Sequence, residues 1–269
     1  MKFKLKATKE IIIAGKTIMC CLKIKSGNHK GKRGAKMNIT PEAVQKNNDR
    51  LALRKLTAIL NANFRGGHLH VVLTYKNQAD YETAKKTFDK FTRKLRSLMK
   101  ENEEELRYVH VIECEHKRLH HHVVINATNI ELIEKAWEHG FVKASALDSS
   151  GEYSKLAAYL LKETQKTFRS GKNPYKKRYT TSANIIKPEI KRVDIDPEEL
   201  LDDPRPLKGY YIPKDLCRRY EHPVTGIEHM EYTMVALGKP VEYKVWPFGD
   251  TISGREYYKP NYFEEQLII

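Results

Sequence analysis

A short strand-forming segment carries three consecutive histidines. Between Arg118 and Ile125 the chain reads RLHHHVVI. Because successive side chains of a β-strand point to opposite faces, His120 and His122 share one face and His121 lies on the other. Two imidazoles at this spacing can bind the same divalent ion. An oxygen ligand would complete a metal site able to act on phosphate.

The segment before this strand supplies a candidate oxygen ligand. It also has the composition of a strand, and only His116 and Lys117 separate the two segments, which predicts a β-hairpin. Counting back from that turn places Glu113 directly opposite His120, where the two side chains share a face. We therefore expect Glu113 and the two same-face histidines to bind a metal ion, with Glu115 as the reserve ligand. A register shift of one residue would turn Glu113 away.

The other histidines of strand-forming segments fit different roles. His121 shares its face with apolar side chains of its own strand, so we expect it to be packed rather than to bind the metal. His68 and His70 repeat the same spacing, but no carboxylate is predicted opposite them. We interpret this pair as structural or DNA-facing, and contact with the metal is the alternative.

A helix with a lysine edge follows, over Tyr153 to Lys166. At about 100° per residue, Lys155, Tyr159, Lys162 and Lys166 fall in one narrow stripe. Tyr153 falls on the apolar side and is predicted to be a core residue. Tyr159 is therefore the better candidate for a nucleophile.

The neighbouring lysines suit a tyrosine nucleophile chemically. A tyrosine hydroxyl has a pKa of about 10 and is a poor nucleophile at neutral pH. Nearby ammonium groups favour the phenolate and stabilise charge that develops on a phosphate. Lys162, one helical turn from Tyr159, is the expected charge-stabilising residue. An amphipathic helix with a solvated lysine edge is the alternative interpretation.

The chain is strongly basic, and its charge is unevenly distributed. It has 49 lysine and arginine residues against 34 acidic ones, a formal net charge of +15, which favours a polyanionic partner. Ten basic and two acidic residues lie between Leu161 and Arg192, whereas Val193 to Pro204 holds six acidic residues and no basic one. This basic strip, interleaved with aromatic residues, suits single-stranded DNA; a solvated surface and an acidic linker are the alternative. The expected DNA-binding residues are Lys155, Lys166, Lys176, Lys177, Arg178 and Tyr179.

The elements that must position these residues alternate along the chain. Hydrophobic periodicity predicts a helix from Pro41 to Phe64 and then, in order, a strand (68–75), a helix (79–100), two strands (107–115 and 118–126), a helix (130–139), a strand (141–147) and a helix (153–166). The order β-α-β-β-α-β-α predicts an α+β fold, an antiparallel sheet of about five strands with helices packed on it. We expect N-terminal strands and a basic loop over residues 1–39, the catalytic domain over 40–192, and an acidic linker with a β-rich extension over 193–269.

Several classes of protein are disfavoured. No apolar run approaches the roughly 18 to 20 residues that span a bilayer, and the N-terminus lacks the apolar segment of a signal peptide. We therefore expect no membrane partner and a cytoplasmic location. The four cysteines show no C-x-x-C spacing, so neither a disulfide framework nor a zinc site is indicated. No G-x-x-x-x-G-K-[ST] pattern is present, so no NTP site or helicase domain is expected.

Taken together, these motifs resemble a known superfamily. The histidine motif His120 to His122, the upstream Glu113 and the Tyr159-Leu160-Leu161-Lys162 motif are similar to those of HUH endonucleases. Within this superfamily the chain resembles rolling-circle replication proteins of phages and plasmids, related to small and filamentous phage initiators. The resemblance covers roughly residues 40 to 190. The middle position of the histidine motif departs from the family, in which it is usually bulky and apolar.

The resemblance implies a fold and a reaction. The fold would be an HUH/RRM-like core, and Mg²⁺ or Mn²⁺ held by His120, His122 and Glu113 would bind the scissile phosphate. Tyr159 would nick single-stranded origin DNA, leaving a 5′-phosphotyrosine and a free 3′-hydroxyl that primes host polymerase, and a later transfer would religate the strand. A host helicase would unwind the duplex.

Other functions remain open at this point. A single-tyrosine HUH transposase or relaxase would use identical nicking chemistry. A non-catalytic single-stranded nucleic-acid-binding protein with an RNA-recognition-like sheet would expose aromatic side chains on its central strands. A hydrolytic metal-dependent nuclease would cut without a covalent step.

Overall fold

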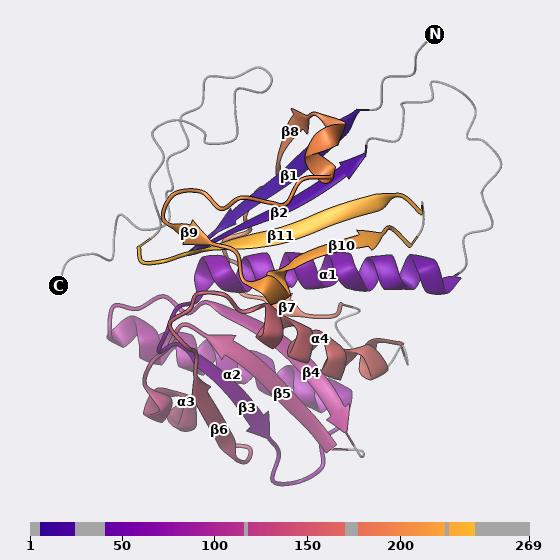
Figure 1. Cartoon of the computed structure of the whole chain (residues 1–269). Coiled ribbons are helices and arrows are strands. Elements are labelled where there is room, and N and C mark those ends of the chain that lie inside the picture. The colour runs from indigo at the N-terminus through magenta and orange to yellow at the C-terminus, as the bar shows by residue number, and fades with distance from the viewer. Residues whose placement is uncertain (1–5, 25–40, 116–117, 170–176, 224–225, 240–269) are drawn as a thin grey trace. The chain divides into compact units, whose positions relative to one another are not determined.

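The computed structural model describes residues 6–24, 41–115, 118–169, 177–223 and 226–239 (Figure 1). The chain forms two compact units. One comprises Ile59–Ile186, and the other combines Met1–Ala58 with Lys187–Ile269. Helix α1 (Pro41–Asn63) contributes residues to both.

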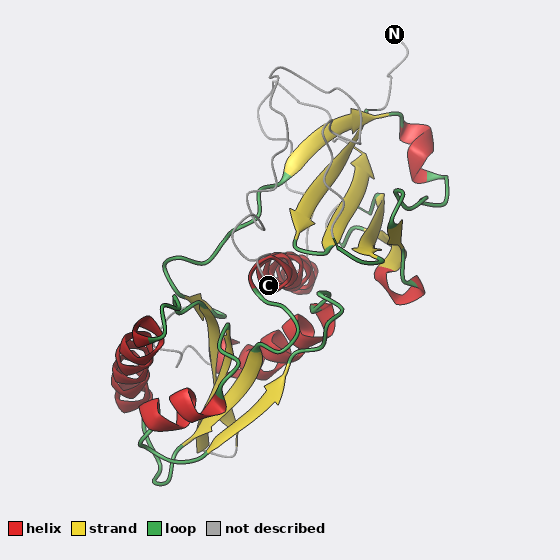
Figure 2. Cartoon of the chain, turned by 90° about the vertical axis from the view of Figure 1, so that its left-hand side faces the viewer, coloured by secondary structure: helices red, strands yellow, loops and turns green. Residues whose placement is uncertain are grey.

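The unit Ile59–Ile186 contains an antiparallel sheet with the order β6-β3-β5-β4-β7. Its strands are β3 (Leu69–Thr74), β4 (Tyr108–Glu115), β5 (Arg118–Ile125), β6 (Val142–Ala146) and β7 (Thr180–Thr181). Its helices are α2 (Tyr81–Glu101), α3 (Ile130–Ala136) and α4 (Ser154–Arg169). Helices flank this five-stranded sheet (Figure 2). The predicted order of elements and the α+β class are confirmed.

The alternation of side chains in the central strands divides this sheet into two faces. In β3, buried residues alternate with half-buried ones, and Leu69, Val71 and Leu73 join a core with residues of α2 and α3. Helix α2 contributes apolar side chains at spacings of three and four, among them Phe88 and Leu95. Burial of these apolar side chains stabilises this face. The opposite face of β3, β4 and β5 is left for the polar side chains of the candidate site.

Segments from both ends of the chain build the second sheet. Its order is β10-β11-β2-β1-β8, and β9 pairs with β11, in strands β1 (Ala7–Ala14), β2 (Thr17–Ile24), β8 (Lys191–Ile195), β9 (Tyr210–Tyr211), β10 (Cys217–Glu221) and β11 (Glu228–Ala236). Two short 3₁₀ helices, Pro197–Leu200 and Lys214–Leu216, interrupt the connections. Part of the acidic segment expected to be a linker therefore belongs to strand β8 and the turn of helix after it.

A buried set of ion pairs lies between the first part of α1 and this second sheet. Arg54 Nη1 is 2.8 Å from Glu10 Oε2, and Arg50 pairs with Glu231. All four side chains are at most 14% exposed. Because a buried charge without a partner is costly, these pairs determine which strands α1 can cover. Among the described residues, no helix is long and apolar enough to cross a membrane.

Candidate active site

The β4–β5 hairpin has the predicted register. Glu113 pairs with His120 across the ladder, and Val111 pairs with His122. Residues directly opposite each other share a face of the sheet, so Glu113, His120 and His122 lie on the face opposite the α2 core. The short connection between two long strands makes this register predictable, because the hairpin turn determines the pairing.

Glu113 and His122 are in direct contact. The carboxylate Oε2 lies 2.7 Å from Nε2 of His122, and the two residues are 6% and 4% exposed. Burying a carboxylate is unfavourable unless it is hydrogen-bonded, so this pair satisfies a group that would otherwise destabilise the fold. His120 is half-buried at the register position opposite Glu113.

His70 also belongs to this site. Its ring stacks on that of His122, with centroids 5.6 Å apart and planes 14° apart, and its Nε2 lies 3.4 Å from His122 Nδ1. Burial, and then the neighbouring His122, lowers the pKa of His70 to about 4, which keeps its imidazole neutral at physiological pH. The period-two pattern already placed His70 on the same face of β3 as Thr74. The order of strands, with β3 beside β5, decided that this face meets the histidine motif.

Helix α4 brings Tyr159 against these imidazoles. The Tyr159 ring lies 5.5 Å from that of His122 and 6.1 Å from that of His70, edge to face in both cases. Tyr159 is 43% exposed, although the same helix buries Ala157, Leu160 and Leu161. The helix thus packs through its apolar side and presents a phenol at the histidine face.

Tyr153 has a different environment. It precedes the first residue of α4, is 3% exposed, and its hydroxyl donates to the carbonyl of Asp148 at 3.0 Å. Its backbone N–H donates to Asn61 Oδ1 at 2.9 Å, which anchors the start of the helix. Burial raises the pKa of the Tyr153 hydroxyl. The prediction that Tyr153 is a core residue is confirmed.

The predicted DNA-binding residues are only partly described. Lys155, Lys162 and Lys177 are exposed, and Arg178 and Tyr179 are half-buried. Lys155 and Lys162 thus share the exposed side of α4 with Tyr159. The remaining predictions on Glu115, Lys166 and Lys176 fall on side chains or residues outside the described part of the chain.

The donor types of this face fit a divalent cation, although they do not form a complete ligand cluster. In the part of the chain that the structure describes, no group of three or more His, Cys, Asp or Glu side chains is arranged to hold a metal ion. Glu113 and His122 instead bond to each other, with His120 beside them on the same face. A carboxylate and two imidazoles are ligands that divalent metals accept, and the Glu113–His122 contact shows that two of these donors reach one point.

His121 lies on the opposite face and is fully buried. Its Nε2 is 2.7 Å from the Tyr75 hydroxyl, and its Nδ1 is 2.9 Å from His110 Nε2. The ring also stacks on Phe88. Burial, with a contribution from the adjacent histidines, lowers the pKa of His121 to about 3. The prediction that it is packed is confirmed: a neutral imidazole stands where an apolar side chain was expected from the resemblance.

His68 also has a structural role. It is 7% exposed, and its Nδ1 accepts a hydrogen bond from the backbone N–H of Arg65 at 3.2 Å. Of the two histidines flanking Leu69, one therefore supports the turn before β3 and the other faces the site. The alternation of a strand separates them, because their neighbours lie on different sides.

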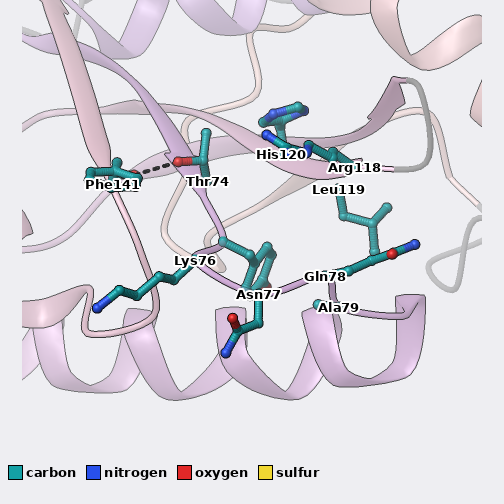
Figure 3. A pocket seen from close by; sticks show the side chains of 10 residues that line it. Thr74, Lys76, Asn77, Gln78, Ala79, Arg118, Leu119, His120 and Phe141 are labelled. Carbon is teal, nitrogen blue, oxygen red and sulfur yellow. Dashed lines mark hydrogen bonds between the residues drawn. The ribbon is translucent and has the colours of Figure 1, made fainter.

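A pocket of about 320 Å³ opens beside His120 (Figure 3). The segment that joins β3 to α2, the first residues of β5 and the residue before β6 line it. Its position next to a candidate metal ligand makes it part of the same surface.

Comparison with known proteins supports a role in replication. Residues 68–168 match the model of a family described as replication-associated protein, of the ORF2 type. The matched segment runs from the residue before β3 into α4, and so includes Glu113, His120, His122 and Tyr159. No curated protein and no solved structure matches the chain.

Proposed function

We propose, with this family match as the premise, that the chain is a rolling-circle replication initiator that nicks single-stranded origin DNA through Tyr159. The observation that carries the proposal is the edge-to-face contact of Tyr159 with His122, a residue of the Glu113–His122 pair. A half-exposed phenol beside a carboxylate and imidazoles suits attack on a phosphodiester at a metal site.

The reaction balances as a transesterification. The phenolic oxygen of Tyr159 attacks phosphorus, the bond from phosphorus to the 3′-oxygen breaks, and the products are a 5′-phosphotyrosine and a 3′-hydroxyl. The phenol gives up its proton and the leaving 3′-oxygen takes one up. Attack by that 3′-hydroxyl, or by another, reverses the linkage and religates a strand. No external oxidant, reductant or nucleotide is consumed.

Each side chain has a distinct task in this scheme. Glu113, His120 and His122 would hold Mg²⁺ or Mn²⁺, and such an ion, when bound, polarises the scissile phosphate. The Lys162 ammonium lies one helical turn from Tyr159, where it favours the phenolate and offsets charge on the phosphate. His70, kept neutral by burial, packs beside both His122 and Tyr159 without adding positive charge.

The same scheme accounts for the exposed cations and for the expected partners. Lys155, Lys177 and Arg178 would contact phosphates of the single strand, so binding should weaken as salt rises. The free 3′-hydroxyl would prime a host polymerase. Since the sequence lacks a Walker-type nucleotide motif, a host helicase would unwind the duplex.

A covalent-adduct assay tests the proposal. The full chain is incubated with labelled single-stranded DNA that contains a candidate origin, in Mn²⁺, and protein–DNA adducts are separated under denaturing conditions. The wild type and Tyr153→Phe should form the adduct, whereas Tyr159→Phe and chelator-treated protein should not. Tyr153 is a matched control because it is the other tyrosine beside α4 and is buried.

Other outcomes identify the rival functions. Cutting that persists in Tyr159→Phe without any adduct would indicate a hydrolytic nuclease. Binding without cutting in any variant would indicate a nucleic-acid-binding protein. A transposase or relaxase would also form the adduct, and the DNA sequence that the chain selects would distinguish these from an initiator.

A further inference from the structure

The pocket beside His120 lies where the candidate site meets the end of β3. Thr74, the last residue of β3, pairs with His120 across the ladder, and both line the pocket. A ligand in the pocket would therefore sit one side chain away from the residues proposed to contact the scissile phosphate. The pocket is large enough for one small organic group, since small-molecule sites begin at about 300 Å³.

The lining residues combine three kinds of chemistry. Lys76 and Arg118 place exposed cations at the pocket, Asn77 and Gln78 add exposed amides, and Phe141 is 70% exposed (Figure 3). Cations bind phosphate, amides hydrogen-bond to the edges of bases, and an aromatic ring stacks on their faces. A nucleotide is the ligand that uses all three at once.

The pocket wall that carries Phe141 is held firmly against β3. The Thr74 N–H donates to the Phe141 carbonyl at 3.0 Å, and the Lys76 N–H donates to the His139 carbonyl at 2.8 Å. A Cβ added at Gly140 would lie 2.1 Å from the Thr74 carbonyl oxygen, so only glycine allows the two backbones to approach this closely. A wall organised in advance reduces the entropy lost when a ligand binds.

The exposure of Phe141 gains meaning from this position. A singly exposed aromatic side chain is common on protein surfaces and needs no explanation by itself. Here it flanks a pocket whose other side is formed by Arg118 and the buried Leu119, next to His120. The aromatic ring, the cations and the candidate metal ligand thus occupy one continuous surface.

We infer that this pocket binds one nucleobase of the single-stranded substrate, next to the scissile phosphate, with the base stacked on Phe141 and its edge facing Asn77 and Gln78. The inference rests on the proposed function and deepens it. The pocket would select the base at one position of the recognised sequence.

Sequencing of adducts from a random pool tests this inference. The full chain is incubated in Mn²⁺ with single-stranded oligonucleotides that have a randomised centre, and the DNA ends that become attached to protein are sequenced. The wild type should prefer one base strongly at a fixed distance from the cut. Phe141→Ala should reduce that preference at least about fivefold and leave the other positions unchanged, because stacking contributes this much per base.

Two further variants make the comparison specific. Phe141→Trp should keep the preference, since the indole ring can still stack. Ile130→Ala removes another exposed apolar side chain of the same unit, 38% exposed on α3, and should change nothing. An unchanged base preference in Phe141→Ala, with adducts still forming, would overturn the pocket and leave the Tyr159 chemistry intact.

A binding measurement separates failure of the pocket from failure of the proposed function. Fluorescence anisotropy with the same random pool, in the Tyr159→Phe background, needs no cleavage. Phe141→Ala should bind at least about fivefold more weakly than its parent. Equal affinities would contradict the pocket, whereas weaker binding combined with no adduct from the wild type would overturn only the nicking reaction.

Discussion

The ring of Tyr159 meets that of His122 edge to face, with 5.5 Å between the centroids and 80° between the planes. The two residues come from elements that are separate in the sequence, helix α4 and strand β5. The same imidazole also bonds to Glu113. One histidine therefore links the candidate nucleophile to the candidate metal ligands.

Removal of a metal ligand should abolish the metal response as well as nicking. Glu113→Gln and His120→Ala should each reduce adduct formation at least about 100-fold, because a metal contributes several kcal/mol to stabilising charge on the phosphate. Mn²⁺ should raise the melting temperature of the wild type, since a ligand that binds only the folded state stabilises it. It should not do so for either variant.

His139→Ala is the matched control for this prediction. His139 is an exposed histidine of the same unit, outside the proposed ligand set. Its substitution should leave both the Mn²⁺ response and nicking unchanged. A melting temperature of Glu113→Gln that still rises with Mn²⁺ as in the wild type would show that the ion binds elsewhere.

Loss of the Lys162 charge should slow nicking without affecting the fold. Lys162 is exposed, so Lys162→Gln should leave the free energy of unfolding within about 0.5 kcal/mol of the wild-type value. Single-turnover adduct formation should slow about 100-fold, the size typical of losing one group that stabilises transition-state charge. Lys90→Gln, an exposed lysine of α2, should keep the wild-type rate. Equal rates in both variants would remove Lys162 from the mechanism.

Substitution of Gly140 should destabilise the unit that carries the site. A Cβ at this position would lie 2.1 Å from the Thr74 carbonyl oxygen and 2.7 Å from the Lys76 nitrogen. Both are backbone atoms that cannot move aside cheaply, so Gly140→Ala should cost about 2 kcal/mol or more in urea unfolding. At Gly238 nothing lies within 4 Å of an added Cβ, and Gly238→Ala should have an effect below about 0.5 kcal/mol. Similar losses from both would contradict the close approach.

Stability should fall in acid as Glu10 becomes protonated. Burial alone would raise the pKa of the Glu10 carboxyl, but hydrogen bonds and charge attraction from Lys23 and Arg54 outweigh it and lower the pKa from 4.5 to about 2. The folded state therefore binds fewer protons than the unfolded state between these values. The stabilisation is fully present above pH 4.5 and is lost as the pH falls toward 2.

Comparison of the wild type with Glu10→Gln checks this pH dependence. At neutral pH the variant should unfold about 3 kcal/mol more easily, because it leaves the buried Arg54 without a carboxylate partner. Between pH 5 and pH 2 the difference between the two proteins should shrink. A constant difference across that range would contradict the coupling to Glu10.

The local pattern of residues was sufficient to predict much of the site. The alternation of a strand separates His120 and His122 from His121, and a short hairpin places Glu113 opposite His120; both follow from neighbours in the chain. Helical spacing likewise separates Tyr159 from Tyr153. These predictions needed no knowledge of distant contacts, because a two-residue connection and a single helix each define their own geometry.

Only the tertiary structure decided which faces meet. His70 lies against His122 because β3 pairs with β5, a choice among strand orders that side-chain alternation leaves open. The pairing of β11 with β2 joins the two ends of the chain in one sheet, although the sequence suggested separate terminal segments. Such pairings depend on the total apolar surface buried and on satisfying buried charges such as Glu10. Both are properties of the whole folded chain, whereas periodicity is a property of each segment.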